Sequence, residues 1–457
     1  MKKTYDVIVV GTGTAGSSIT QACRDEGKTV AVIDRRTFGG TCPQRGCDPK
    51  KVLVGAAEWM DWKERMAGRG LAGNAEIDWQ ELMAFKRTFT EPIPEATEKK
   101  FSSLGIDCYH GDAKFISDTK LKVGDNELIG RKIVLATGAA PMKLGLDGED
   151  LMIHSEDFLD LDELPKKIIF AGGGYISMEF ASLAARAGSE VHVIHRGERP
   201  LEPFDGDLVD LLMKRLEETG VRFHLNTSVK SVERSGDGFT VSAEKDDSAE
   251  TFTADLVVHG LGRAPSLDVD TKAGNIKLGD KGGVKVNEYL QSVTNPNVYA
   301  AGDCAETGAP PLTPVSSDDA ELVVQNLLHG NSRPADYAPI PSVAFTVPKV
   351  GSVGMTGEDA EKADRKLDVT FREITDWFTF RRTNEQAAGF KLITDPEKGT
   401  IVGAHLLGGN ADELINHFSM FIHLETPIET IKNLEFAYPT AASDIGSMLA
   451  EIGNEKD

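Results

Sequence analysis

Positive charge is scarce in this 457-residue chain. It has 50 lysines and arginines against 72 aspartates and glutamates, and its formal net charge is -22. Binding to a nucleic-acid backbone needs a basic surface that displaces counterions, and anionic lipid headgroups attract the same kind of surface. The composition therefore argues against nucleic acid and against an anionic membrane surface as partners.

Long apolar runs are also missing. No stretch approaches the ~18 consecutive apolar residues that a membrane-spanning helix needs. The apolar run at residues 5–10 is brief and leads into a glycine-rich turn, so we interpret it as a β-strand and not as a signal peptide. The length and the 40% share of apolar residues predict roughly two to four folded domains, and we expect a cytoplasmic protein.

Cysteine is scarce too. The five cysteines are an odd number spread over a long chain, which excludes the disulfide framework of a small secreted protein. Only Cys42 and Cys47 are closely spaced. A metal site would need further ligands, and the chain has neither a second cysteine pair nor an H-x3-H cluster, so we expect no metal. Two unreactive buried cysteines are the alternative interpretation of the pair.

Two segments show the order strand, glycine turn, helix and strand that is typical of a nucleotide-binding βαβ unit. In the first, residues 5–10 lead into Gly11-Thr12-Gly13-Thr14-Ala15-Gly16 and a helical stretch. In the second, residues 167–171 lead into Gly172-Gly173-Gly174 and another helix. Each unit closes with an apolar strand that runs into glycine, as parallel strands do at the ligand edge of a sheet.

The first turn has the spacing that binds a dinucleotide. Gly11 allows the tight turn, Gly13 lets the backbone approach a pyrophosphate, and Gly16 lets helix and strand pack closely. Asp34 ends the second strand, where a carboxylate accepts hydrogen bonds from an unmodified adenosine ribose. The combination predicts dinucleotide binding, and a purely structural turn is the alternative.

Cys42 and Cys47 follow this unit in the segment GGTCPQRGCDPKK. On an ideal helix, residues five apart are roughly 8–9 Å apart at Cα, whereas a disulfide needs about 4.4–6.8 Å. The pair can therefore bridge only if Pro43, Gly46 and Pro49 bend or interrupt the helix, and such strain would make the bond easier to reduce. Helix-start amides and basic neighbours would favour the reactive thiolate. The basic neighbours are Arg45, Lys50 and Lys51.

In these features the chain resembles the flavoprotein disulfide reductases, such as glutathione reductase, lipoamide dehydrogenase and mercuric reductase. The resemblance covers nearly the whole chain and rests on motifs in a fixed order. Besides the cysteine segment and the second glycine turn, they are Ala136-Thr137-Gly138, Gly262-Arg263-Ala264-Pro265, Ala301-Gly302-Asp303 and Leu312-Thr313-Pro314-Val315. The expected fold is α/β, with two Rossmann-like dinucleotide-binding domains and a C-terminal α+β dimerisation domain.

The same motifs predict the domain boundaries. We expect an FAD-binding domain at residues 1–148, whose second, central part is 266–337, and an NAD(P)H-binding domain at 149–265 between them. A proline-containing linker then opens an α+β domain at 338–457, which carries no nucleotide fingerprint. The resemblance implies that this domain forms a homodimer.

The resemblance also implies roles for individual residues. FAD would occupy the first unit, with Asp303 on its ribityl or pyrophosphate region, and NAD(P)H would occupy the second. Lys50 and Glu179 would form an ion pair beside the flavin, Cys47 would face the flavin, and Cys42 would attack the substrate. Tyr175 would be the gate residue over the nicotinamide site. The residues expected to hold the cofactors are Gly11, Gly13, Gly16, Asp34, Gly40, Thr41, Thr137, Gly138, Gly172, Gly174, Tyr175, Ser177, Arg196, Gly262, Arg263, Asp303 and Thr313.

The end of the second strand of the NAD(P)H unit bears on the choice of nucleotide. NADH sites place an acid there, whereas the 2′-phosphate of NADPH calls for cations. The position reads His195-Arg196-Gly197-Glu198-Arg199, so Arg196, supported by Arg199, predicts NADPH. Glu202 stands where glutathione reductases place a second arginine, and an Arg196 that merely faces water is the alternative.

The C-terminal tail departs from the family pattern. Relatives have His-Pro-Thr followed by a glutamate, whereas this chain has Tyr438-Pro439-Thr440, with Ser443 at the glutamate position and Asp444 one place beyond. A phenol, with a pKa near 10 in water, is a poor base but can donate a proton to a leaving thiolate. Coenzyme A disulfide reductases use tyrosine in this role. We expect Tyr438 to act so in the partner's active site; packing at the interface is the alternative.

Two substrates of the family lose support. The first helix has Gln21 where glutathione reductases carry arginine, and the tail at 451–457 lacks the paired cysteines of mercuric reductases. We therefore predict an FAD-dependent NAD(P)H oxidoreductase that passes electrons through Cys42 and Cys47 to a low-molecular-weight disulfide or similar soft electrophile. A metal-ion or quinone reductase, and a flavin-bound redox sensor that controls a protein partner, remain open as alternatives.

Overall fold

The computed structural model describes residues 2–453 and divides into two compact units. The first comprises Met1–Lys50, Ala84–Met142 and Gly262–Tyr337; the second comprises Lys51–Met83, Lys143–Leu261 and Ala338–Asp457. Two of the boundaries fall inside the helices α3 (Cys47–Arg65) and α4 (Trp79–Thr90). Within residues 2–453, none of the helices has both the length and the apolar character that crossing a membrane would require.

A seven-stranded sheet forms the centre of the first unit. Its order is β3-β2-β1-β6-β5-β4, and β17 pairs with β6. The strands are β1 (Lys2–Val10), β2 (Val30–Asp34), β3 (Asp107–His110), β4 (Ala113–Ser117), β5 (Lys120–Val123), β6 (Asn126–Leu135) and β17 (Val298–Ala300). The pairs of β1 with β2 and β6, of β2 with β3 and of β17 with β6 are parallel.

The register of this sheet brings four strand ends together. Val10 is aligned with Ile33 and Leu135, and Leu135 with Ala300. Because these strands are parallel, the glycine-rich segments that follow them meet at one edge, which is where open α/β sheets bind ligands.

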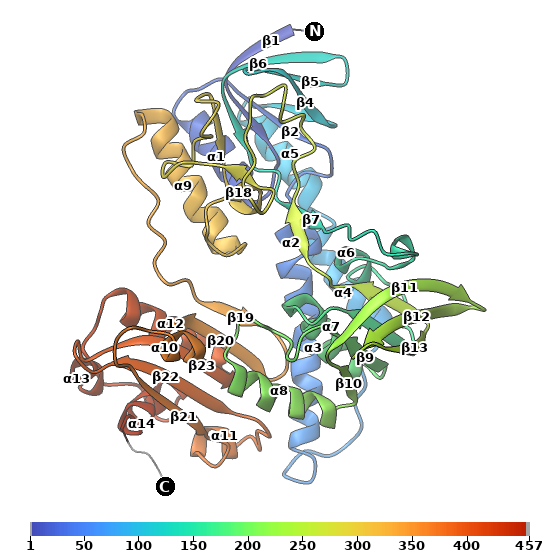
Figure 1. Cartoon of the computed structure of the whole chain (residues 1–457), viewed down its shortest axis with the longest axis vertical. Helices are drawn as coiled ribbons and strands as arrows, with labels where there is room; N and C mark the ends of the chain where they lie inside the picture. Colours follow the sequence, from blue (N-terminus) through green and yellow to red (C-terminus); the bar gives the residue numbers. More distant parts are fainter. Residues whose placement is uncertain (1, 454–457) are drawn as a thin grey trace. The chain divides into compact units, whose positions relative to one another are not determined.

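Helices cover this sheet because their apolar residues recur on one face. In α1 (Thr14–Asp25), Ala15, Ile19 and Cys23 are buried at intervals of four residues and join the core with Val7 and Val9. Figure 1 shows α1 beside α9 (Thr313–His329), and the two helices pack together. The remaining elements are α2 (Thr41–Arg45), α5 (Ile93–Ser103), η2 (Gly302–Cys304), and the paired strands β7 (Ala139–Pro141) with β15 (Arg263–Pro265) and β16 (Val284–Lys285) with β18 (Ala305–Glu306).

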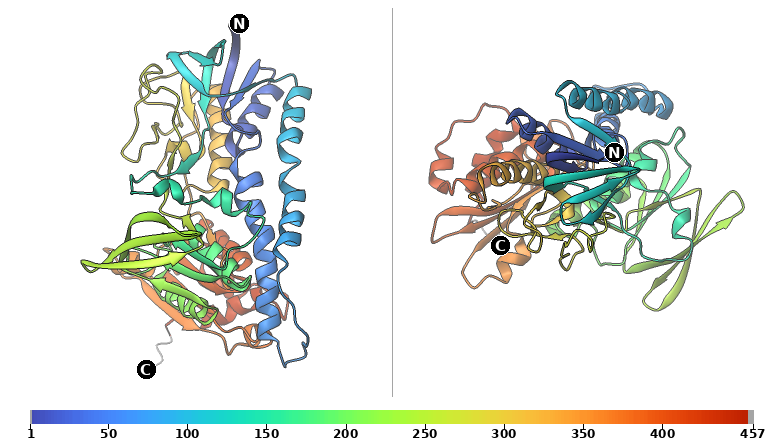
Figure 2. Two further views of the ribbon diagram at one scale, coloured as in Figure 1. Left: turned by 90° about the vertical axis from the view of Figure 1, so that its right-hand side faces the viewer. Right: turned by 90° about the horizontal axis from the view of Figure 1, so that it is seen from above.

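The second unit contains a parallel four-stranded sheet of order β10-β9-β8-β14. The strands are β8 (Lys167–Ala171), β9 (Glu190–Ile194), β10 (Val221–His224) and β14 (Leu256–His259), and the helices near them are α6 (Ser155–Phe158), α7 (Tyr175–Arg186) and α8 (Gly206–Glu218), with a short η1 (Glu149–Leu151). A separate antiparallel sheet consists of β11 (Thr227–Ser235), β12 (Gly238–Lys245) and β13 (Ser248–Ala254), which Figure 2 shows as a twisted ribbon.

The C-terminal part of the second unit is an antiparallel sheet of order β19-β20-β23-β22-β21. Its elements are β19 (Ser342–Ala344), β20 (Lys349–Gly354), α10 (Gly357–Glu361), β21 (Asp368–Glu373), α11 (Phe378–Arg381), β22 (Gly389–Asp395), β23 (Thr400–Gly408), α12 (Ala411–His423), α13 (Ile428–Lys432), η3 (Ala441–Ser443) and α14 (Asp444–Ala450). Phe390 and Phe418 are fully buried between the sheet and its helices. Two parallel nucleotide-type sheets followed by an α+β region agree with the predicted fold class.

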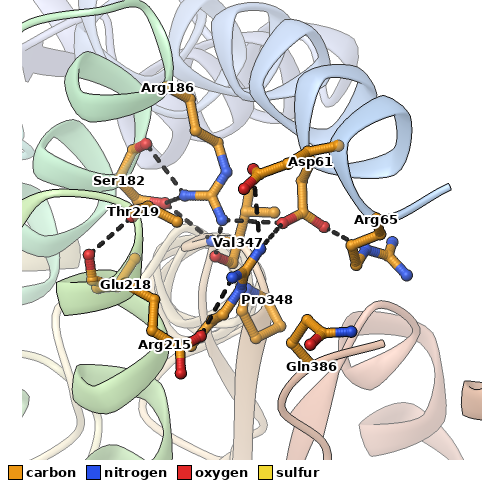
Figure 3. A network of polar contacts seen from close by, with 12 residues as sticks. Asp61, Arg65, Ser182, Arg186, Arg215, Glu218, Thr219, Val347, Pro348 and Gln386 are labelled. Carbon is orange, nitrogen blue, oxygen red and sulfur yellow. Dashed lines mark hydrogen bonds and ion pairs between the residues drawn. The ribbon is translucent and has the colours of Figure 1, made fainter. Parts of the chain in front are cut away.

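A buried charge cluster ties the elements of the second unit together (Figure 3). Asp61 of α3 forms ion pairs with Arg65 at 2.6 Å, Arg186 at 3.0 Å and Arg215 at 3.2 Å. All four side chains are at most 8% exposed. Arg186 also donates to the carbonyl of Val347 at 2.7 Å. One carboxylate therefore links α3, α7, α8 and the chain segment that leads into β20.

Candidate active site

The sequence-predicted site residues are divided between the two units. The first unit holds Gly11, Gly13, Gly16, Asp34, Gly40, Thr41, Cys42, Cys47, Lys50, Thr137, Gly138, Gly262, Arg263, Asp303 and Thr313. The second holds Gly172, Gly174, Tyr175, Ser177, Glu179, Arg196 and Tyr438. The expected pairing of Lys50 with Glu179 joins the two units and stays a prediction. Within the second unit, the Glu179 carboxylate accepts a hydrogen bond from the Phe345 amide at 2.8 Å.

The first glycine turn is shaped for close backbone approach. Gly11 has a φ of 108°, and a Cβ on it would lie 2.1 Å from the Ala136 carbonyl oxygen, so no side chain fits. A Cβ on Gly40 would lie 2.3 Å from the Gly13 Cα, which shows that the start of the cysteine segment touches the turn. Among the residues that the structure describes, and apart from its chain neighbours, only Gly40 lies within 4 Å of the Cβ position of Gly13, and α1 begins there without a side-chain cap or an acid in its first turn. Such a helix start can bind the pyrophosphate of FAD.

The Asp34 carboxylate stabilises this turn through hydrogen bonds and can still accept one more. Its carboxylate accepts from the Thr12 amide at 2.8 Å, the Thr12 hydroxyl at 2.6 Å and the Arg36 amide at 2.9 Å. A carboxylate has about four acceptor positions, so one remains for a ribose hydroxyl. The observed arrangement fits an unmodified adenosine ribose.

Asp319, which the sequence analysis did not single out, positions a third segment at the same sheet edge. This buried residue of α9 accepts from the Gly302 amide at 2.8 Å and from the Tyr337 hydroxyl at 2.5 Å. It thereby fixes the turn that carries Asp303, whose pKa burial raises and Arg263 partly lowers again. Arg263 in turn donates to the Ala139 carbonyl at 2.5 Å. The signal in the sequence was an acid at a position of α9 that falls among the apolar residues Val315, Leu322 and Val323 of its buried face.

The two cysteines lie on either side of a helix interruption. Helix α2 ends at Arg45, Gly46 has φ -140° and ψ -116°, and α3 begins at Cys47. A Cβ on Gly46 would lie 3.0 Å from the Thr41 carbonyl and 3.3 Å from the Cys42 Cα, so the chain doubles back closely at this point. Such a break is what the spacing argument requires for the pair to meet. Both cysteines are free thiols in the structure.

One hydroxyl group contacts both sulfurs. Thr313 Oγ1, at the first residue of α9, lies 3.6 Å from Cys42 Sγ and 3.6 Å from Cys47 Sγ, a hydrogen-bond distance for sulfur. The only carboxylate in hydrogen-bond contact with these sulfurs among residues 2–453 is Asp48, whose Oδ1 lies 3.9 Å from Cys42 Sγ. Thr313 was predicted as a flavin contact, whereas its contact with the sulfurs joins residues 266 positions apart and has no local signal.

The two thiols differ sharply in acidity. The pKa of Cys47 is lowered to about 6, mainly by the hydrogen bond from Cys42 and also by Thr313 and Lys50, which together outweigh the effect of burial. The same hydrogen bond and burial raise the pKa of Cys42. The reduced pair is therefore a thiol at Cys42 and a thiolate at Cys47.

Of the three basic neighbours expected to favour the thiolate, Lys50 is one of the main groups that lower the pKa of Cys47. Arg45 lies 3.4 Å from the Thr37 hydroxyl. Lys51 pairs with Asp412 at 3.3 Å within the second unit. The three side chains differ because they point in different directions from α2 and α3. Sequence spacing alone does not give these directions.

The second glycine turn repeats the first with one change. In the first unit the Thr12 amide donates to Asp34, and in the second the Gly173 amide donates to His195 Nδ1 at 3.2 Å, each pair being 22 residues apart. Since an amide can only donate, Nδ1 is the acceptor, and Nε2 carries the hydrogen that reaches the Arg199 carbonyl at 3.0 Å. Burial lowers the pKa of His195. A neutral imidazole thus replaces the carboxylate, a correspondence visible in the equal spacing.

The surroundings of this turn are open to a nucleotide. Apart from Gly174 and its chain neighbours, no atom of residues 2–453 lies within 4 Å of the Cβ position of Gly174, and α7 starts there with no side-chain cap. Arg196 is exposed, and Tyr175 is 43% exposed at the first position of α7. Arg199, by contrast, pairs with Asp210 at 2.8 Å. Ser177 is buried and packs directly against Gly260. A Cβ on Gly260 would lie 1.9 Å from the Ser177 hydroxyl oxygen.

The tail leaves Tyr438 on the surface. Its side chain is 82% exposed, and no polar partner for its hydroxyl occurs within residues 2–453 of the same chain. Ser443 instead donates to the Thr440 carbonyl at 2.6 Å. Asp444, whose pKa burial raises, faces Thr379. Neither residue contacts Tyr438 in the way the family glutamate supports its histidine.

A closely held cysteine pair and a nucleotide-type glycine turn in the first unit, and a second such turn in the second unit, are the features of a flavin-dependent dithiol oxidoreductase. Residues 5–320 match the family model described as pyridine nucleotide-disulphide oxidoreductase, and residues 340–449 match its dimerisation domain. The chain belongs to this family, an FAD-dependent class of enzymes that use NAD(P)H, and the predicted family membership and enzyme class are confirmed. The matched dimerisation domain supports a homodimer.

Individual relatives place the chain within this family. It is 31% identical to trypanothione reductase from Trypanosoma congolense over 98% of this chain and 96% of that protein. A 181-residue stretch, 40% of the chain, is 54% identical to the whole of an uncharacterized 19.7 kDa protein in the mercuric resistance operon of Staphylococcus aureus. The structure of the HOCl-induced flavoprotein disulfide reductase RclA from Escherichia coli matches with a TM-score of 0.87 and 26% identity, covering 98% of this chain and 99% of that one.

Proposed function

We propose that the chain is a homodimeric NADPH oxidoreductase that passes two electrons to the Cys42–Cys47 pair and on to a small disulfide or similar soft electrophile. The observation that carries this proposal is the asymmetric dithiol. Thr313 Oγ1 lies 3.6 Å from both sulfurs, and the pKa of Cys47 falls to about 6 while that of Cys42 rises. A thiol and a thiolate held together can take an electron pair from one side and release it on the other.

The residues divide this work between them. FAD bound at the first glycine turn supplies the two-electron transfer between the nicotinamide and the dithiol. In the proposed arrangement, Asp34 and the Gly13 turn hold the cofactor, and Lys50 stabilises the Cys47 thiolate. Cys42 attacks the acceptor, and Cys47 then attacks Cys42 to re-form the disulfide.

Thiol counting under anaerobic conditions tests this function. One equivalent of NADPH should make two further cysteines per chain reactive toward iodoacetamide, and peptide mass spectrometry should locate both at Cys42 and Cys47. Cys23 and Cys304 are fully buried and serve as internal controls that should stay unmodified. Oxidation of NADPH without any new reactive cysteine would rule out the dithiol relay.

The proposed preference for NADPH rests on the second glycine turn. The position that carries a carboxylate in the first unit is a neutral His195, although the Glu202 carboxylate lies 3.7 Å from its Nε2. Arg196 next to it is exposed and can pair with a 2′-phosphate. Arg199, held by Asp210, adds less than the sequence suggested. The cytoplasmic location likewise stays a prediction.

Replacing His195 with aspartate should exchange the nucleotide preference. The carboxylate would accept from the ribose hydroxyls and repel the 2′-phosphate, so the ratio of NADP⁺ to NAD⁺ affinity should fall by about 10- to 100-fold. Isothermal titration of the oxidised protein with each nucleotide measures this ratio. His195→Asn, which keeps an uncharged acceptor for the Gly173 amide, should leave the ratio near that of the native protein. Tighter binding of NAD⁺ than NADP⁺ by the native protein would contradict the proposed preference.

We further propose that Tyr438 donates a proton to the thiolate that leaves the acceptor. Its exposure, and the lack of a polar partner for its hydroxyl among residues 2–453 of its own chain, suit a residue that completes the site of a second subunit. Tyr438→Phe should lower the turnover of a disulfide acceptor roughly 10²-fold near neutral pH, the usual effect of losing a general acid. Tyr438→His should restore turnover with a pH profile that follows an imidazole. If turnover of the disulfide has the same pH profile in native protein and in Tyr438→Phe, Tyr438 is not a proton donor and only packs at the interface.

Reduction of a soft metal ion is a second candidate function. It is favoured by the 54% identity with a protein of a mercuric resistance operon. Within residues 2–453, no group of three or more His, Cys, Asp and Glu side chains forms a separate metal site, so the Cys42–Cys47 pair itself would meet the ion. Consumption of NADPH with Hg²⁺ or Cu²⁺, in the absence of turnover with every disulfide tested, would favour this function.

A further inference from the structure

Asp48 places a negative charge beside Cys42. It is an exposed residue in the first turn of α3, directly after Cys47, yet its carboxylate contacts the other cysteine. Asp48 Oδ1 lies 3.9 Å from Cys42 Sγ. At this distance a carboxylate accepts a long hydrogen bond from a thiol and repels a thiolate.

The charges around the two sulfurs are therefore arranged oppositely. Cys47 has the cationic Lys50 as a neighbour, and Cys42 has the anionic Asp48. Thr313 is neutral and contacts both sulfurs. Asp48 disfavours a negative charge on Cys47 as well, but as the smallest of the effects on that thiol. Its electrostatic effect on Cys42 is likewise the smallest of the effects on that thiol, but there its carboxylate also accepts the long hydrogen bond.

We propose that Asp48 keeps the proton of the reduced pair on Cys42 and selects acceptors that are neutral or cationic. This inference rests on the proposed function of the dithiol. An anionic acceptor would have to bring its charge beside the Asp48 carboxylate, on a protein whose net charge is already -22. A neutral disulfide, a disulfide with amino groups or a soft metal cation meets no such repulsion.

The electron and proton balance of the step with a disulfide is as follows. The Cys42 sulfur attacks one sulfur of the acceptor R–S–S–R while its proton passes to the Asp48 carboxylate, and the acceptor S–S bond breaks. The leaving thiolate takes up one proton, which the proton held by Asp48 replaces, and departs as RSH. The Cys47 thiolate then attacks Cys42 Sγ, which forms the enzyme disulfide and releases the second RS⁻. The dithiol is oxidised by two electrons, the acceptor is reduced by two, and the one proton of the reduced pair leaves in RSH, with Asp48 again a carboxylate.

A pair of alkylating agents tests the charge effect without knowledge of the acceptor. Iodoacetate is anionic and iodoacetamide is neutral, and otherwise both attack thiolates alike. In the NADPH-reduced protein, Asp48→Asn should raise the ratio of iodoacetate to iodoacetamide labelling at Cys42 by about fivefold, the effect of removing one charge about 4 Å away in water. The pH at which Cys42 is half-labelled should fall by roughly one unit, because the thiolate is no longer repelled. Peptide mass spectrometry reads Cys42 and Cys47 separately.

Two variants control for other effects of the substitution. Glu95→Gln removes an exposed acid from the first turn of α5 in the same unit. It therefore has the same loss of one negative charge and of one acid at a helix start, but away from the two sulfurs. It should leave labelling of Cys42 unchanged. Asp48→Glu keeps the charge and should keep the labelling ratio low. The proposal would be overturned if Asp48→Asn and native protein had the same ratio of iodoacetate to iodoacetamide labelling at Cys42. It would also be overturned if Glu95→Gln raised this ratio as much as Asp48→Asn does.

Model acceptors then test the selectivity. Native protein should reduce cystamine, a cationic disulfide, and 2-hydroxyethyl disulfide, a neutral one, faster than the anionic 3,3′-dithiodipropionate. In Asp48→Asn the ratio of these rates to the rate with the anionic disulfide should be at least about fivefold smaller. A native preference for the anionic disulfide would refute the selectivity. If none of the disulfides is turned over while the labelling ratio still changes in Asp48→Asn, the proposed disulfide reduction fails but the role of Asp48 at Cys42 stands.

Discussion

Replacing Cys47 with serine should lower NADPH-dependent turnover of any acceptor that uses the dithiol by roughly 10³-fold or more, because the variant cannot form or re-form the intramolecular disulfide. The thiolate that Lys50 and Thr313 stabilise would also be lost. The charge-transfer absorbance between this thiolate and the flavin should therefore be absent on anaerobic two-electron reduction. Stopped-flow spectroscopy measures both the absorbance and the rate of reoxidation by the acceptor.

The pH dependence of this absorbance gives an independent check in the native protein. The pKa of Cys47 is about 6, so the thiolate and its absorbance should be present above that pH and disappear as the pH falls through it. Cys42→Ser should keep the absorbance and lose turnover with disulfides. Cys108→Ser, which changes another half-buried cysteine of the first unit, should change neither. Turnover within tenfold of native in Cys47→Ser would mean that electrons leave the flavin directly, as in a quinone reductase.

Replacing Asp61 with asparagine should have the largest effect on stability. The substitution would leave Arg65, Arg186 and Arg215 together in a buried site without the carboxylate they share. Removing one partner of a buried ion pair costs about 3–5 kcal/mol, because the remaining charge stays desolvated. Urea unfolding followed by intrinsic fluorescence measures the loss. Glu218→Gln, which removes the exposed partner of Arg215 at 3.2 Å, should cost less than about 1 kcal/mol.

The same cluster predicts the direction of acid sensitivity. Burial by itself would raise the pKa of Asp61, but Arg186 and Arg65 outweigh it, and the pKa in the folded state lies below its usual value. A carboxyl with a depressed pKa stabilises the fold at pH values above its unfolded pKa of about 4, and this contribution disappears as the pH falls through the folded pKa. In Asp61→Asn the free energy of unfolding should therefore change less between pH 6 and pH 3 than it does in native protein. Equal slopes would show that the cluster does not govern this range.

The family and its two nucleotide units could be predicted from local sequence because their signals are short-range. An apolar strand, glycines at fixed spacing and a helix start lie within about 30 residues of each other, and the backbone geometry of Gly11 leaves no choice of residue. The need for a break between Cys42 and Cys47 followed from helix geometry alone, and the break occurs at Gly46. The acid at Asp34 and the histidine at His195 were both noted at strand ends. Their equivalence emerged only when both were found to accept from a turn amide.

The sequence by itself thus determined the class of enzyme, the redox pair and the two glycine turns. The tertiary structure decided which side chains surround that pair and how its single proton is placed. Thr313 comes to the sulfurs across 266 residues, and Asp48 contacts Cys42 instead of its own neighbour Cys47. Asp61 forms ion pairs with three arginines from three parts of the chain. The physical reason is that acidity and ion pairing depend on distances of 3–4 Å between side chains, which packing sets and local propensity does not encode.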